Sequence, residues 1–189
     1  IKTTEPKKAF ADLTFFELNK RTTPEEIATF LKPAEIGNDM GLLSEAGCPG
    51  VADPGAEIVK MAHEKGIEVI PFVGPSSILL ALMSSGMNGQ GFSFQGYLSA
   101  KKPELSKDLN RLEQLSRKYR QTQIFIETPY RNMGMLEEAF KTLSAETRLC
   151  VAVDLSLETE FILTKKIKDW KKLKLPNFHK RPAIFLIQG

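Results

Sequence analysis

Residues 43–55 read LSEAGCPGVADPG and decide the fold, because they place a loop rich in glycine and proline between a strand and a helix. Residues 39–44 are predicted to form a buried strand, and residues 56–65 a helix that stops at Gly66. Ligands of open α/β sheets bind at the carboxyl ends of strands, where glycines let them approach the backbone. The loop therefore predicts either one wall of a ligand site or a demanding turn between two core elements, and the residues alone favour neither.

A polyphosphate is not the ligand that this loop predicts. It has neither the dinucleotide-binding fingerprint nor the Lys-Ser/Thr ending of a nucleotide-triphosphate loop. A nucleoside ligand without a polyphosphate fits better. A second junction from strand to helix, GPSSI at residues 74–78, offers the hydroxyls of Ser76 and Ser77, which can cap the following helix or bind a ligand's polar groups.

Strands and helices alternate around both junctions, which predicts βαβ units and a mainly parallel sheet in the first half of the chain. One helix starts at a capping box formed by Thr23 and Glu26 and runs to about Leu31. The other predicted elements are strands at 13–18, 67–73, 92–97, 123–127, 148–154, 158–164 and 183–187, and helices at 76–85, 106–119, 132–143 and 167–173.

The predicted fold class is α/β with two lobes. The segment MNGQG (residues 87–91) is predicted to be a hinge, so that residues 1–89 form an N-terminal cofactor-binding lobe and residues 90–189 a C-terminal substrate lobe. Two successive strands near the end of the chain predict a mixed sheet in the second lobe. The active-site cleft is expected between the lobes.

The charge is unevenly distributed. Residues 1–91 hold 8 Lys+Arg and 12 Asp+Glu, a net −4, whereas residues 92–189 hold 18 and 11, a net +7. A basic half favours a polyanionic partner, although a lysine-rich surface also serves solubility alone. The basic stretch 165–181 contains Trp170 and Phe178, so it predicts either phosphate contacts with base stacking or a solvated face with Trp170 packed inward.

Several classes of protein are not expected. No apolar run approaches the roughly 18 residues of a membrane span, and the first residues have no apolar signal segment. Cys48 and Cys150 have neither the spacing of a disulfide framework nor that of a metal site, and only two histidines are present, so no metal is expected. A cytoplasmic protein is the default expectation.

Four motifs then follow one another in the order and spacing of a known family. They are SEAGCPGVADPG (44–55), IEVIPFVGPSS (67–77), GYLSAK (96–101) and ETPYR (127–131). The chain resembles, over roughly residues 39–189, the ribosomal RNA small-subunit methyltransferase I type of the tetrapyrrole methylase superfamily. That family carries S-[DE]-A-G-x-P-x-x-x-D-P-G, P-G-P, G-[FY]-L-P-x-K and E-[ST]-x-x-R.

The resemblance implies a function and a site. The family uses S-adenosyl-L-methionine to methylate a ribose 2′-hydroxyl of 16S ribosomal RNA in the small ribosomal subunit, usually as a homodimer. Glu127 is the expected general base, Lys101 would orient a phosphate or the hydroxyl, and Arg131 would clamp phosphate or pair with Glu127. The alternative for Glu127 and Arg131 is a purely structural buried ion pair. The residues expected to bind the cofactor are Glu45, Gly47, Cys48, Pro49, Val51, Ser76, Ser77, Ile78, Thr128, Pro129 and Ala183.

This sequence also departs from the family pattern. Cys48 stands where many relatives have Asp or Thr, and Ser99 replaces the usual proline. The strand and Gly-rich turn with which the family begins are not recognised before Leu13, so we expect the first strand of the sheet to be absent from this sequence. Two other functions therefore remain open: a methylase of a tetrapyrrole, and a non-catalytic RNA-binding protein of the same fold.

Overall fold

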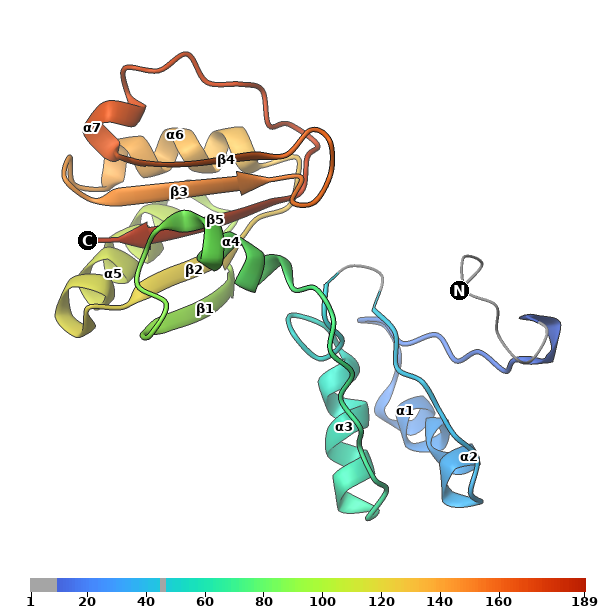
Figure 1. The fold of residues 1–189 in the computed structure, drawn as a ribbon. Coiled ribbons are helices and arrows are strands. Elements are labelled where there is room, and N and C mark those ends of the chain that lie inside the picture. Colours follow the sequence, from blue (N-terminus) through green and yellow to red (C-terminus); the bar gives the residue numbers. More distant parts are fainter. Residues whose placement is uncertain (1–9, 45–46) are drawn as a thin grey trace. The chain divides into compact units, whose positions relative to one another are not determined.

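The computed structural model describes residues 10–44 and 47–189 of the 189-residue chain. The chain divides into two compact units, Ile1–Gly74 and Pro75–Gly189 (Figure 1). The assignment of residues 1–89 to cofactor and 90–189 to substrate stays a prediction.

The described part of the first unit consists of helices and loops. Thr23 caps α1 (Pro24–Phe30) through the predicted capping box, since Glu26 N donates to Thr23 Oγ1 at 3.3 Å and Thr23 N donates to Glu26 Oε2 at 2.8 Å. The predicted helix after the Gly/Pro-rich loop is α3 (Gly55–Glu64), and Gly66 follows it at a positive φ of 68°. The sequence did not predict the short helices η1 (Phe10–Asp12) and α2 (Lys32–Glu35).

The strands predicted in this unit are wrong. Residues 13–18, 39–44 and 67–73 form no strand in the structure. A strand needs a neighbour to pair its amides and carbonyls, and the described part of the first unit supplies none. Large apolar side chains of these segments are consequently exposed, among them Phe72, which is 92% exposed. The described residues of the first unit therefore do not form the expected parallel sheet.

The second unit contains the predicted mixed sheet. Its strand order is β1-β2-β5-β3-β4, with β1 parallel to β2 and the other neighbours antiparallel. The strands are β1 (Phe92–Tyr97), β2 (Thr122–Ile126), β3 (Arg148–Val153), β4 (Phe161–Lys166) and β5 (Ala183–Gln188).

Helices cover both faces of this sheet (Figure 1). On one face, α4 (Ser77–Ser85) packs on β3, β4 and β5, and its Ala81 and Leu82 join the core beneath it. The larger core lies on the other face, under α5 (Lys102–Tyr119), α6 (Asn132–Thr142) and α7 (Ile167–Trp170). Each helix lies close to its predicted position, because its apolar periodicity matches the face that it buries.

The predicted hinge at residues 87–91 is a fixed turn inside the second unit. Asn88 Nδ2 donates to Arg120 O at 2.7 Å, and Thr122 Oγ1 donates to Asn88 O at 2.9 Å. These bonds tie the turn to β2 and to the end of α5. Gly and Asn therefore supply a tight connection here, not a flexible one.

Candidate functional site

One carboxylate organises the Gly/Pro-rich loop of the first unit. Asp53 Oδ1 accepts hydrogen bonds from Gly55 N at 2.8 Å and Gly50 N at 3.1 Å, and Oδ2 accepts one from Ser44 Oγ at 3.1 Å. Burial raises the pKa of Asp53, but these three hydrogen bonds outweigh it, so the pKa lies below its usual value. Asp53 was within the recognised motif but was not singled out, and its position before a Pro-Gly turn is the signal that could have found it.

The loop backbone has the special conformations that its glycines predicted. Gly47 and Gly50 have φ of 80° and 77°, and Ala52 also lies at positive φ. Among the described residues, and apart from its chain neighbours, no atom lies within 4 Å of the position that a Cβ on Gly47 would take. Val51 is exposed and Cys48 half-buried. The expected contact residue Glu45 lies outside the described residues.

In the second unit, several of the candidate residues lie at the same end of the sheet's strands. Ile126 pairs with Ile184, and Val153 pairs with both Ala183 and Phe161, so the carboxyl ends of β2 and β3 lie beside the start of β5 and β4. The motif ETPYR follows β2 directly at this end of the sheet. The register thus brings Glu127, Thr128 and Pro129 to the same end as Ala183.

Glu127 and Arg131 form an ion pair that also joins two motifs. Arg131 Nη2 lies 2.8 Å from Glu127 Oε2, and it donates a hydrogen bond of 2.8 Å to the carbonyl of Ser99, in the GYLSAK motif. The Glu127 side chain is 1% exposed, and its Oε1 accepts from Thr128 N at 2.6 Å. Oε2 is buried and receives no directed hydrogen bond from the described residues, so charge attraction holds the pair.

The other candidates at this end of the sheet differ in their exposure to solvent. Lys101 is exposed at the N-cap of α5, and Thr128 is exposed after Glu127. Pro129 is half-buried and its carbonyl accepts from Lys180 N at 2.9 Å. Ala183 is buried in β5. As an alanine, it can offer a ligand only its backbone and one methyl group.

The start of α4 carries Ser76, Ser77 and Ile78, all half-buried. Ser76 occupies the N-cap position, but its side chain makes no capping hydrogen bond, so the predicted cap is wrong. The helix instead keeps its first turn through the backbone, with Leu80 N donating to Ser76 O at 2.9 Å. The Ser76 hydroxyl is therefore not used by the helix.

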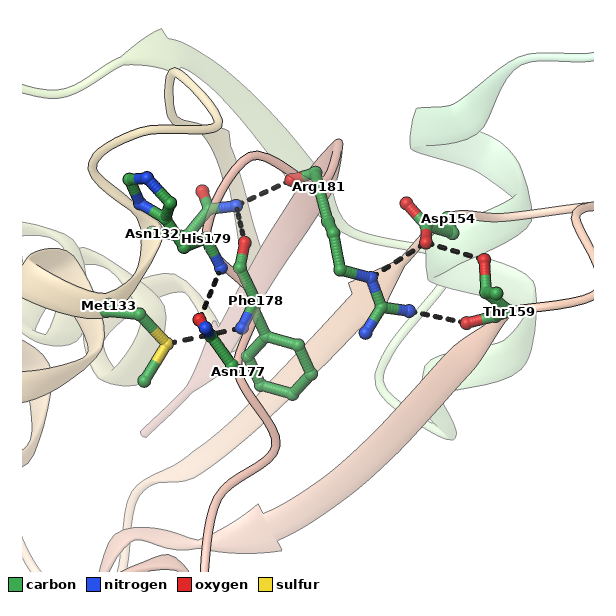
Figure 2. A network of polar contacts seen from close by, with 8 residues as sticks. All are labelled: Asn132, Met133, Asp154, Thr159, Asn177, Phe178, His179 and Arg181. Atoms are coloured by element: carbon green, nitrogen blue, oxygen red, sulfur yellow. Dashed lines mark hydrogen bonds and ion pairs between the residues drawn. The ribbon is translucent and has the colours of Figure 1, made fainter.

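A network that the sequence did not predict fixes the loop before β5 (Figure 2). Arg181 Nε donates to Asp154 Oδ2 at 2.8 Å, and its Nη2 donates to Thr159 O at 2.5 Å. Asn132, which is fully buried at the start of α6, donates from Nδ2 to the carbonyls of Phe178 at 3.1 Å and Arg181 at 2.6 Å. Burial raises the pKa of Asp154, but the hydrogen bond from Thr159 and the charged Arg181 outweigh it and lower the pKa.

The basic stretch 165–181 is only partly available to a partner. Trp170 and Phe178 are buried in the core, so the prediction that they stack on bases is wrong, and the alternative of an inward Trp170 is confirmed. Trp170 Nε1 donates to Leu149 O at 2.8 Å, which satisfies its polar edge. Exposed Glu146 pairs with Lys166 and Lys168, and their hydrogen bonds lower its pKa to about 2.

The described part of the chain offers neither a cluster of metal ligands nor a membrane-spanning helix. Within residues 10–44 and 47–189, no three His, Cys, Asp or Glu side chains lie together in a way that could hold a metal ion. None of the described helices combines the length and the apolar character needed to cross a membrane.

Proteins of known name resemble this chain in sequence. It is 30% identical over 177 residues to ribosomal RNA small subunit methyltransferase I of Haemophilus influenzae, which covers 93% of this chain and 61% of that protein. It is 36% identical over 158 residues to the protein of the same name from Bacillus subtilis, covering 84% of this chain and 49% of that protein. The chain is a relative of these methyltransferases. The resemblance drawn from the four motifs is thus confirmed, and the longer match also reaches into residues 1–38.

Solved structures show the same fold at lower identity. The methyltransferase CobJ matches 91% of this chain and 73% of its own, with a TM-score of 0.61 and 16% identity. A cobalt precorrin-4 methyltransferase, CbiF, gives a TM-score of 0.56 at 15% identity, over 89% of this chain and 72% of its own. The chain therefore has an α/β fold with a mixed sheet that is similar to the tetrapyrrole methylases. No family model matches the chain. It spans between about half and three-fifths of the length of the named relatives.

Proposed function

We propose that this protein is an S-adenosyl-L-methionine-dependent methyltransferase that methylates a ribose 2′-hydroxyl of 16S ribosomal RNA. The similarity to proteins named ribosomal RNA small subunit methyltransferase I, over 93% of the chain in one case, carries the proposal. The bond from Arg131 to Ser99 supports it, because it joins two of the four motifs in space. We also propose a cytoplasmic homodimer in which residues 1–89 serve mainly the cofactor and residues 90–189 the substrate.

The described residues fit the proposed cofactor. The described residues leave room for a ligand against the backbone of Gly47, and exposed Val51 offers an apolar surface to an adenine ring. The Ser76 hydroxyl, which the helix does not use, suits a ribose or amino-acid group. The cofactor supplies a methyl group activated by a sulfonium. The other proposed contacts are Glu45, Cys48, Pro49, Ser77, Ile78, Thr128, Pro129 and Ala183.

The different burial of the charged residues supports different proposed roles for them. Exposed Lys101 can reach a phosphate of the substrate. Glu127 as a general base must accept the proton of the ribose hydroxyl, so its carboxylate must turn away from Arg131 when substrate binds. The competing role is positioning, in which Glu127 keeps Arg131 bonded to Ser99 and so fixes the loop before Lys101.

Glu127→Gln distinguishes the two roles. A base role predicts that kcat falls by at least about 100-fold while cofactor affinity by calorimetry stays within twofold. A positioning role predicts a rise in KM for RNA with a smaller change in kcat, and the same rise in Arg131→Gln. Unchanged kcat in Glu127→Gln would remove the base role.

A tetrapyrrole substrate is the second candidate, since the solved structures with this fold include tetrapyrrole methylases. The net charge of +7 in residues 92–189 favours RNA. Transfer of a labelled methyl group to 30S subunits, naked 16S RNA and a porphyrinogen, measured in parallel, separates the two. Transfer to none of them, with cofactor still bound, would support the non-catalytic RNA-binding alternative.

A further inference from the structure

Tyr130 presents an aromatic ring to solvent at the same end of the sheet as Glu127. It lies between Pro129 and Arg131 in the ETPYR motif and is 67% exposed. The imidazole of His179 meets the ring edge-on, with ring centroids 5.8 Å apart and an interplanar angle of 76°. Lys180 Nζ lies 5.7 Å from the ring centroid. His179 and Lys180 are themselves exposed, so the three side chains form one surface, here called the Tyr130 platform.

The backbone under this platform is held on both sides. Lys180 N donates to Pro129 O at 2.9 Å, which ties the loop before β5 to the ETPYR motif. Buried Asn132 bonds the carbonyls of Phe178 and Arg181, on either side of His179 and Lys180 (Figure 2). Arg131 N donates to Thr128 O at 2.9 Å and closes the turn that carries Tyr130. Hydrogen bonds therefore fix the backbone that carries the three side chains of the platform.

The chemistry of this surface suits one class of ligand. Unstacked bases of single-stranded RNA stack on tyrosine and histidine rings, and a neighbouring ammonium can bind the adjoining phosphate. Two aromatic side chains and an exposed cation close together are typical of such a site. The aromatic residues of the basic stretch, Trp170 and Phe178, cannot stack because both are buried. A tightly packed protein interface would be expected to bury a larger apolar area than these polar-rimmed rings offer.

We propose that the Tyr130 platform stacks an unpaired nucleobase of the RNA substrate beside the target nucleotide, with Lys180 contacting its phosphate. This inference rests on the proposed RNA substrate. It assigns Tyr130, His179 and Lys180 to substrate positioning. No bond is made or broken at the platform.

The chain offers a matched control for the test. Tyr119, at the end of α5, is 54% exposed, and Lys118 Nζ lies 5.1 Å from its ring centroid. Tyr119 lies outside the four motifs. Among the ring contacts of the described residues, it has no aromatic partner that corresponds to His179. Tyr119→Ala and Lys118→Gln therefore remove the same groups from another surface.

Affinity for naked 16S RNA is measured by filter binding, without methyl transfer, for Tyr130→Ala, Tyr130→Phe and Tyr119→Ala. We expect Tyr130→Ala to raise the Kd about tenfold, as loss of one stacked base does, and the other two to stay within twofold of wild type. Lys180→Gln should lower the slope of log Kd against log salt by about one, and Lys118→Gln should not.

Three results would overturn the inference. Equal affinities of Tyr130→Ala and Tyr119→Ala would show that the ring contributes nothing. A loss in Tyr130→Phe as large as in Tyr130→Ala would show a hydroxyl contact in place of stacking. A change in oligomeric state of Tyr130→Ala, measured by light scattering, would show an interface between copies. If wild type binds no RNA, the proposed function fails first; if it binds RNA and the Tyr130 variants do not differ, only this inference fails.

Discussion

The Gly/Pro-rich loop at residues 47–55 and the ETPYR motif are equally recognisable in sequence, but different forces hold them. The loop depends on Asp53, which bonds two backbone amides and Ser44, in a unit whose described residues contain no strand. The ETPYR motif follows a buried strand in a five-stranded sheet with helices on both faces. A recognisable motif therefore does not predict how strongly the surrounding fold supports it.

The largest expected effect tests the support of the second unit. Phe125 is fully buried and stacks on Phe185 at 5.6 Å between centroids, so Phe125→Ala should destabilise this unit by about 3–5 kcal/mol. Phe72→Ala, in the first unit, should change stability by less than about 0.5 kcal/mol, because Phe72 is exposed. Urea unfolding measures both. Similar losses in the two variants would contradict the contrast between the units.

A smaller effect is expected at the loop. Asp53→Asn keeps the shape of the side chain but removes the charge that accepts from Gly50, Gly55 and Ser44, and should cost about 1–2 kcal/mol in the first unit. Local amide exchange at Gly50 and Gly55 should accelerate, while exchange in β2 stays unchanged. Asp39→Asn, outside the loop, is the control. Unchanged exchange at Gly55 would show that the turn holds itself without the carboxylate.

The smallest effect concerns pH and the second unit. The pKa of Asp154 is lowered in the folded protein, so its stabilisation is present above the unfolded value of about 4 and disappears as pH falls through the folded pKa. Wild type should exceed Asp154→Asn in stability by about 1 kcal/mol at pH 7, and the difference should shrink below about pH 4. Thermal unfolding at pH 3 to 7 measures it. A constant difference across this range would contradict the role of the ionised carboxylate.

The sequence predicted the second unit well because its signals are local. The apolar periodicity of residues 106–119 and the short apolar runs at 123–127 and 183–187 each match one face or one buried strand of the structure. The strands predicted at 39–44 and 67–73 carry similar local patterns, but the described part of the first unit offers them no pairing partner. No local pattern reveals whether such a partner exists.

The candidate site was predicted in its residues but not in their contacts. The ETPYR motif predicts that Glu127 and Arg131 belong to the site. An ion pair between them is one of the two interpretations that the sequence allows, and the structure contains it. The bonds of Arg131 to Ser99 and of Arg181 to Asp154 join segments 32 and 27 residues apart, so spacing along the chain could not predict them. Tyr130 was missed because exposure, not residue type, distinguishes it from Phe178.

One measurement tests the proposed activity, methyl transfer to ribosomal RNA, most directly. The protein is incubated with S-adenosyl-L-methionine labelled in its methyl group and with 30S subunits, naked 16S RNA or a porphyrinogen. We expect label in the RNA, released by nuclease digestion as a 2′-O-methylated nucleotide, and none in the porphyrinogen. Label in the porphyrinogen alone, or in a base instead of the ribose, would contradict it.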